Sequence, residues 1–234
     1  METKLKTPLI VAHRGAHKDK AVDENTLEAF AQAFTYNVDA IEGDFHLTSD
    51  TYILCHHNPT LQGYAIKEQP LNKLRQLKPD LPTLDKVLAL VPFDKMIFIE
   101  IKCGIEIFEY LVPLIRASKL KQSQIVIISF NAEVIHQAKI TYPQMQAYWL
   151  YEFHKDEIPS LNNIKKVLDV CQADGISTNM NEHIDKKWID KICKSGYEYH
   201  VWTAKSWKID SLDKIDRFKE WGIMSITMDD IDII

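Results

Sequence analysis

The segment Met96-Ile-Phe-Ile-Glu-Ile-Lys102 indicates the fold most directly. Its apolar run is almost continuous, as in the strands of a parallel sheet that is covered on both faces. Side chains alternate between the two faces of a strand, so Phe98, Glu100 and Lys102 share one side. A buried strand therefore carries a carboxylate and an amine on one face, toward its C-terminal end.

The chain on either side of this segment alternates between strand and helix patterns. Helices are predicted over 105–118, 132–141, 160–171, 182–194 and 209–220. The principal strands are predicted to contain His13, Glu42, Glu100, Ser129, Trp149, Ser177, Trp202 and Thr227. Such an alternation predicts an α/β protein with a parallel sheet, and eight strands predict a (βα)₈ TIM-type barrel. A doubly wound open sheet is the alternative, but no glycine-rich phosphate turn follows the first strand.

Two departures from the regular alternation are predicted near the second strand. A hairpin excursion turns at Ser49-Asp50, and a hairpin centred there places Glu42 opposite His57. A slip of one residue would move the two side chains to opposite faces. Residues 58–82 contain several prolines and are interpreted as a small irregular insertion near the site. Otherwise residues 1–234 are predicted to form a single barrel domain.

Composition excludes several classes of protein. A net charge of −5, spread along 234 residues, argues against a nucleic-acid partner. The four cysteines lack the spacing of a zinc site, so reduced, buried thiols are expected. Residues 1–7 are polar and precede too few apolar residues for a signal peptide, and no apolar run is long enough to span a membrane. We therefore expect a cytoplasmic protein without stable membrane insertion; its oligomeric state is not predicted.

Polar side chains collect at the predicted C-terminal ends of the strands, where barrel enzymes place their active sites. They are His13, Arg14, Glu42, Asp44, Glu100, Lys102 and Trp202. Glu42 and Asp44 share one face of their strand and would repel each other without a cation between them; oxygen ligands suit Ca²⁺ or Mg²⁺. Carboxylates, histidines and basic side chains together predict a metal site beside a phosphate site.

The ordered motifs resemble the glycerophosphodiester phosphodiesterase family. The matching blocks are His13-Arg-Gly15, Glu24-Asn-Thr26, Glu42-Gly-Asp44, Leu47-Thr-Ser-Asp50, His57, Glu100-Ile-Lys102, Ile128-Ser-Phe-Asn131, Val201-Trp-Thr203 and the Gly222 to Thr227 ending. The resemblance runs nearly the full length of the chain. It implies a (βα)₈ barrel, one divalent cation, and hydrolysis of a glycerophosphodiester to glycerol 3-phosphate and an alcohol.

The resemblance also implies a role for each matching residue. The implied metal ligands are Glu42, Asp44 and Glu100, the acid–base pair is His13 and His57, and the phosphate contacts are Arg14 and Lys102. Glu24 would support the wall of the site, and Trp202 would either pack in the core or form a wall for the glycerol.

Three positions depart from the family pattern. Asn58 replaces an aspartate that could hold an imidazolium by charge, Thr51 replaces a turn glycine, and Met228-Asp229-Asp230 replaces an Asp-x-Pro ending.

Several alternatives remain open at this point. His56 could take the place of His57 if the strand register is wrong. His46 shares the face of Glu42 and Asp44 and is expected in a solvent-exposed or hairpin-tip position, with a metal ligand as the alternative. The other histidines are interpreted as structural or surface residues: His17, His136, His154, His183 and His200. Alternative functions are a lysophospholipase D-like phosphodiesterase and a non-catalytic glycerophosphodiester-binding barrel.

Overall fold

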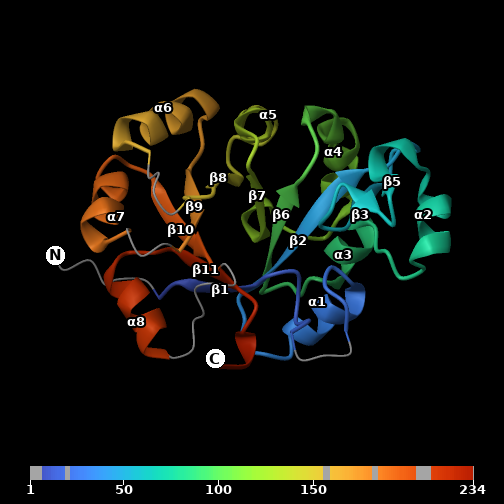
Figure 1. Ribbon diagram of the computed structural model, residues 1–234, viewed down its shortest axis with the longest axis horizontal. Helices are drawn as coiled ribbons and strands as arrows, with labels where there is room; N and C mark the ends of the chain where they lie inside the picture. The colour runs from blue at the N-terminus through green and yellow to red at the C-terminus, as the bar shows by residue number, and fades with distance from the viewer. Residues whose placement is uncertain (1–6, 19–21, 155–158, 181–183, 204–211, 234) are drawn as a thin grey trace.

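Eight parallel strands close into a barrel in the computed structural model, which describes residues 7–18, 22–154, 159–180, 184–203 and 212–233 (Figure 1). The strand order is β1-β11-β10-β9-β8-β7-β6-β2, and β1 pairs with β2 to close the ring. The strands are β1 (Leu9–Ala12), β2 (Ala40–Leu47), β6 (Met96–Ile101), β7 (Ile125–Ser129), β8 (Gln146–Tyr151), β9 (Gly175–Asn179), β10 (Glu198–Trp202) and β11 (Ser225–Met228). The predicted TIM-type barrel is confirmed, and closure of the ring excludes the open sheet.

Helices surround the ring, and those at the five predicted ranges are present. They are α1 (Leu27–Ala33), α2 (Leu71–Leu77), α3 (Leu84–Leu90), α4 (Phe108–Ala117), α5 (Ala132–Thr141), α6 (Leu161–Cys171), α7 (Lys186–Cys193) and α8 (Leu212–Glu220). Of the helices predicted over 182–194 and 209–220, residues 182–183 and 209–211 lie outside the described residues.

The alternation of side chains along β2 decides what faces the barrel axis. Ile41 and Phe45 point outward and pack in the large core between strands and helices. Ala40 points inward and joins the apolar layer inside the barrel. Glu42 and Asp44 lie on the same inward face, above this layer. Gly43 permits close packing of α1, because a Cβ atom there would lie 3.0 Å from the Phe30 ring.

The hairpin after β2 forms with a register one residue away from the prediction. Strand β3 (Ile53–Cys55) pairs antiparallel with β2 outside the ring, with Phe45 opposite Cys55. The turn includes Thr51 in the left-handed region, at φ +68°, and is centred on residue 50. Glu42 is therefore not opposite His57, which lies beyond the end of the ladder.

The predicted insertion at residues 58–82 is present, but it contains regular elements that pack in a small apolar cluster, so the description of it as irregular is wrong. The segment contains β4 (Thr60–Leu61), β5 (Tyr64–Ala65), the 3₁₀ helix η1 (Ile66–Glu68) and α2. The cluster joins Leu54 of β3 to the buried apolar side chains of the segment, which are Leu61, Ile66, Leu71, Leu74 and Leu81. These elements are only two to seven residues long, too short for a clear periodic pattern.

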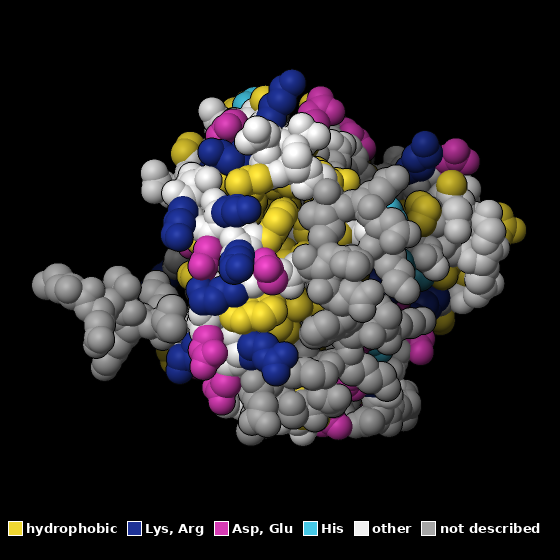
Figure 2. All heavy atoms as spheres, turned by 60° about the vertical axis from the view of Figure 1, so that its left-hand side comes forward, with side chains coloured by type: hydrophobic (Ala, Val, Ile, Leu, Met, Phe, Trp, Pro, Cys, Tyr) yellow, Lys and Arg dark blue, Asp and Glu magenta, His cyan; other side chains and the backbone are white. Residues whose placement is uncertain are grey.

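The surface mixes charges of both signs. On the face in Figure 2, the visible Lys and Arg side chains are interspersed with Asp and Glu side chains. No helix in the described part of the chain is long and apolar enough to cross a membrane. All four cysteines are free, as predicted, but Cys193 is exposed rather than buried.

Candidate active site

A tight turn after β1 presents the first two site residues. The backbone N–H of His13 donates to Met228 O of β11, at 3.0 Å. Arg14 and Gly15 then adopt left-handed backbone conformations, at φ +54° and +83°. A Cβ atom on Gly15 would lie 2.6 Å from the backbone of Ala29, so only glycine fits here without movement. This turn directs the Arg14 N–H toward Glu42 Oε2, at 3.1 Å.

Three buried carboxylates from β2 and β6 meet at the barrel mouth. One oxygen from each of Glu42, Asp44 and Glu100 lies within 4.8 Å of the others. No described residue donates a hydrogen bond to Glu42 Oε1 or Asp44 Oδ1, although the Lys102 ammonium lies 3.2 Å from the latter. Buried oxygens seldom remain without partners. Oxygen donors in this number and spacing fit a hard divalent cation.

The three carboxyl groups differ in their tendency to ionise. Burial, together with the charge of Asp44, raises the pKa of Glu42 to about 8 and that of Glu100 to about 7. Burial also opposes ionisation of Asp44, but Lys102, Arg14 and a hydrogen bond from Asn25 together lower its pKa to about 2. Asp44 is therefore the charged member near neutral pH, while Glu42 is mostly protonated and Glu100 about half protonated unless a cation approaches.

Two basic side chains adjoin these carboxylates. Lys102 Nζ lies 2.7 Å from Glu100 Oε1. Arg14 Nε lies 3.1 Å from Asp44 Oδ2, and its Nη1 is 3.1 Å from both oxygens of Glu24. Glu24 thus orients the guanidinium from the outside. Lys102 and Arg14 both line a cavity of about 490 Å³ at the barrel mouth, which we call the central cavity.

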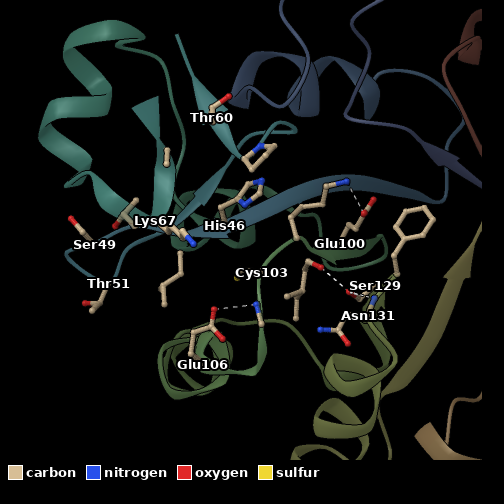
Figure 3. Close-up of a pocket in the computed structure, with 18 residues that line it drawn as sticks. His46, Ser49, Thr51, Thr60, Lys67, Glu100, Cys103, Glu106, Ser129 and Asn131 are labelled. Atoms are coloured by element: carbon tan, nitrogen blue, oxygen red, sulfur yellow. Dashed lines mark hydrogen bonds and ion pairs between the residues drawn. The ribbon is translucent and has the colours of Figure 1, made fainter. Parts of the chain in front are cut away.

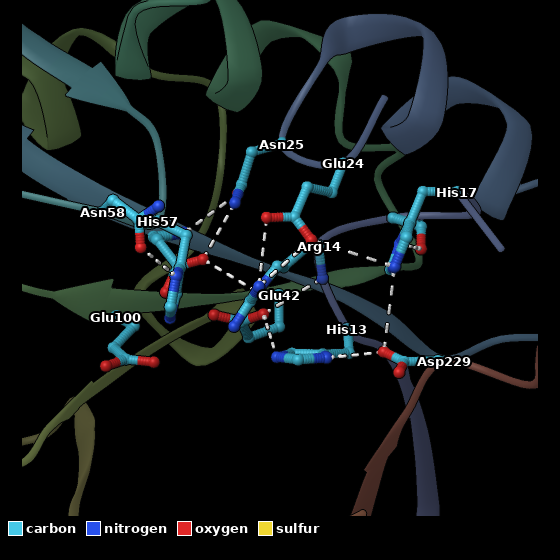
Figure 4. A network of polar contacts seen from close by, with 12 residues as sticks. His13, Arg14, His17, Glu24, Asn25, Glu42, His57, Asn58, Glu100 and Asp229 are labelled. Atoms are coloured by element: carbon cyan, nitrogen blue, oxygen red, sulfur yellow. Dashed lines mark hydrogen bonds and ion pairs between the residues drawn. The ribbon is translucent and has the colours of Figure 1, made fainter. Parts of the chain in front are cut away.

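Both predicted catalytic histidines also line the central cavity (Figure 4). His13 Nδ1 lies 2.6 Å from Asp229 Oδ1, and His57 Nδ1 lies 3.0 Å from Asn58 Oδ1. Each ring is anchored through Nδ1, which leaves Nε2 available for proton transfer. Burial lowers the pKa of both rings, but the hydrogen bond to Asp229 and the Glu42 charge outweigh it for His13, whose pKa is raised. The pKa of His57 is lowered.

The structure adds three residues that the sequence interpretation missed. Asp229 anchors His13, although the altered family ending gave no clear reason to choose it. Asn25 belongs to a matching block but was given no role in the site; its Nδ2 donates to Asp44 Oδ2 at 2.8 Å and its Oδ1 accepts from Asp44 N at 3.1 Å. His17 was interpreted as a structural or surface residue, yet its Nε2 lies 4.0 Å from both Glu24 and Asp229.

The structure places the remaining histidines and Trp202 in different positions relative to the central cavity. His46 is buried, with 6% exposure, and its Nε2 lies 3.2 Å from the carbonyl oxygen of His57; the expectation of a solvent-exposed tip is wrong because the insertion covers the hairpin. His56 is not among the described residues that line the central cavity. Trp202 lines that cavity and contacts Phe130 edge to face, with ring centroids 6.4 Å apart. His183 lies outside the described residues.

Comparisons with known proteins identify a family and relatives of the chain. The model of the Glycerophosphoryl diester phosphodiesterase family matches residues 13–233. A curated glycerophosphodiester phosphodiesterase of Caldanaerobacter subterraneus subsp. tengcongensis is 26% identical over 232 residues, covering 81% of this chain and 91% of that protein.

Solved structures share the fold at lower identity. A Galdieria sulphuraria structure has a TM-score of 0.83 at 19% identity and covers 99% of this chain and 97% of its own. An Oleispira antarctica phosphodiesterase, solved in complex with the product sn-glycerol-3-phosphate, has a TM-score of 0.77 at 20% identity, with 95% and 93% covered. Since the family model spans nearly the whole chain and the fold agrees, the chain belongs to the glycerophosphoryl diester phosphodiesterase family, a family of phosphoric diester hydrolases.

Proposed function

We propose that the chain hydrolyses glycerophosphodiesters to glycerol 3-phosphate and an alcohol, with one divalent cation, Ca²⁺ or Mg²⁺, as cofactor. The single observation that carries the proposal is that three buried carboxylates, two anchored imidazoles and the basic side chains of Arg14 and Lys102 meet at one barrel mouth. The Oleispira antarctica phosphodiesterase was solved with sn-glycerol-3-phosphate, which supports the same product here.

In this proposal Glu42, Asp44 and Glu100 hold the cation. A bound cation would supply positive charge beside the phosphate and stabilise the negative charge that develops on the phosphate oxygens. Arg14 and Lys102 add positive charge at the same group and orient it. Trp202 forms an apolar wall for the glycerol carbons, while Glu24 keeps Arg14 in place.

The two histidines move the protons. One Nε2 accepts a proton from the attacking hydroxyl, either the glycerol 2-hydroxyl or water, as the new P–O bond forms. The other Nε2 donates a proton to the alcohol oxygen as the second P–O bond breaks. Attack by the 2-hydroxyl would form a cyclic phosphate that water opens in a second step; attack by water would release glycerol 3-phosphate directly.

The test is glycerol 3-phosphate release from several glycerophosphodiesters in the presence of Ca²⁺, Mg²⁺ or EDTA. His13→Ala and His57→Ala should each lower kcat by about 10²–10⁴-fold, the usual contribution of positioned proton transfer. His56→Ala is the matched control, because it changes a neighbouring histidine outside the central cavity. Circular dichroism should show that all three variants remain folded.

The alternatives predict different results. A non-catalytic binding barrel would bind the diesters but release no glycerol 3-phosphate. A lysophospholipase D-like enzyme would prefer substrates with an acyl chain. If His56→Ala were as impaired as His13→Ala while His57→Ala stayed active, the second catalytic histidine would be His56 and the assignment of His57 would be wrong.

A further inference from the structure

A second cavity adjoins the central cavity and is larger. It has a volume of about 830 Å³ and lies between the hairpin and insertion on one side and the loops after β6 and β7 on the other (Figure 3). We call it the side cavity. The polar side chains that the argument uses are His46, Thr60, Lys67, Glu106 and Asn131.

The two cavities are joined at the catalytic centre. Glu100, Lys102 and Phe130 line both of them. A phosphodiester has two organic arms that diverge from phosphorus. With the phosphate beside Lys102, one arm can extend into the central cavity toward Trp202, and the other passes Phe130 into the side cavity. The geometry therefore allows one substrate to occupy both cavities.

The charges on the side cavity differ from those of the central cavity. Lys67 comes from η1 of the insertion, and among the described residues no acidic side chain forms an ion pair with it. Glu106 lies on the opposite wall, where its carboxylate accepts a hydrogen bond from Gly104 N at 3.0 Å (Figure 3). Within the described part of the chain, the side cavity thus offers an ammonium group without an ion-pair partner and a carboxylate that is already hydrogen-bonded.

The neutral groups of the side cavity also favour a polar ligand. Thr60 contributes a hydroxyl group. Asn131 Oδ1 accepts from Glu133 N at 2.9 Å, which leaves the amide NH₂ of Asn131 as a donor. Phe130 is the one six-membered aromatic ring among the described lining residues, so the wall lacks the several aromatic faces that enclose quaternary ammonium groups.

We propose that the side cavity binds the leaving alcohol of the substrate, and that Lys67 selects alcohols carrying a negative charge over those carrying a quaternary ammonium. This inference rests on the proposed hydrolysis of glycerophosphodiesters. Lys67 and Glu106 are both exposed, so solvent weakens their electrostatic effect. We therefore expect a selectivity change of about 3–10-fold from Lys67, rather than an all-or-none effect.

The experiment compares two substrates that differ in the alcohol: glycerophosphoserine, whose serine carries a carboxylate beside its ammonium group, and glycerophosphocholine, whose choline carries a trimethylammonium group and no carboxylate. The ratio of their kcat/KM values is measured for the parent, Lys67→Met and Lys67→Glu. The ratio should fall about 3–10-fold in Lys67→Met and further in Lys67→Glu. Lys86→Met is the matched control: Lys86 is an exposed lysine of α3 that lines neither cavity, so its ratio should equal that of the parent.

Calorimetric binding of the two diesters separates this inference from the proposed function. A parent that binds both diesters without releasing glycerol 3-phosphate, and whose binding preference follows Lys67, would overturn the catalytic proposal and support the side cavity assignment. Release of glycerol 3-phosphate with an unchanged selectivity ratio in both Lys67 variants would overturn the side cavity assignment alone. A protein that neither binds nor hydrolyses either diester would overturn both.

Discussion

Binding of a divalent cation at the three carboxylates is expected to release protons. At pH 7 a carboxyl group with a pKa of about 8, as for Glu42, is about 90% protonated, and one with a pKa of about 7, as for Glu100, is about half protonated. Asp44, with a pKa of about 2, holds no proton to lose. Because a cation binds the ionised groups, its binding should release about 1.4 protons at pH 7.

The same linkage sets the pH dependence of affinity. The affinity for Ca²⁺ or Mg²⁺ should rise about 25-fold between pH 6.5 and 7.5, because about 1.4 protons leave on average across this interval. Above about pH 9 both groups are already ionised, so affinity should no longer change with pH on their account.

Isothermal titration calorimetry can count these protons. Titrations with MgCl₂ or CaCl₂ at pH 7, in buffers of different ionisation enthalpy, give the number of protons released as the slope of observed heat against buffer enthalpy. Glu42→Gln should lower the release to about 0.5 proton and weaken binding. Glu24→Gln is the control, since Glu24 contacts Arg14 and is not one of the three clustered carboxylates. A heat that is independent of the buffer, with intact binding, would refute the assignment of raised pKa values to the cation ligands.

Three further predictions concern stability and catalysis. In EDTA, the melting temperature of the parent minus that of Glu42→Gln should fall as pH rises from about 5 to 8. A carboxyl group whose pKa is raised on folding stabilises the folded state while it is protonated, and Glu42 loses this proton in that range; a constant difference in melting temperature would contradict the prediction. Asn58→Asp should move the pH–rate limb of His57 upward, since a carboxylate would favour its imidazolium, and an unmoved limb in kcat against pH would count against His57 as the titrating group. Leu74→Ala should destabilise the insertion by about 2–5 kcal/mol in denaturant unfolding, whereas a cost near zero would mean that its small core does not order this segment.

The barrel and most of the site residues could be predicted from the sequence because their signals are local. An apolar run such as 96–101 is typical of a strand buried on both faces, and alternation assigns Glu42 and Asp44 to one face regardless of what lies elsewhere. The topology then brings the ends of β1, β2 and β6 together. His13, Glu42 and Glu100 therefore converge although they are far apart in the chain.

The hairpin register and the insertion depended on contacts that the sequence does not display. The register was missed by one residue because the left-handed conformation of Thr51 changes the centre of the turn. His46 is buried and lines the side cavity together with Thr60 and Lys67 of the insertion, whose short elements gave no periodic pattern.

Polar contacts between residues far apart in the chain also depend on the tertiary structure. Asp229 is 216 residues from His13, and the two meet because β1 and β11 are neighbours in the closed ring. The pKa values of Glu42 and Glu100 likewise depend on burial and on the charge of Asp44, which exist only after folding. The order of residues along the chain specifies which chemical groups are available and on which strand ends they lie; closure of the barrel sets their partners, their burial and hence their charge.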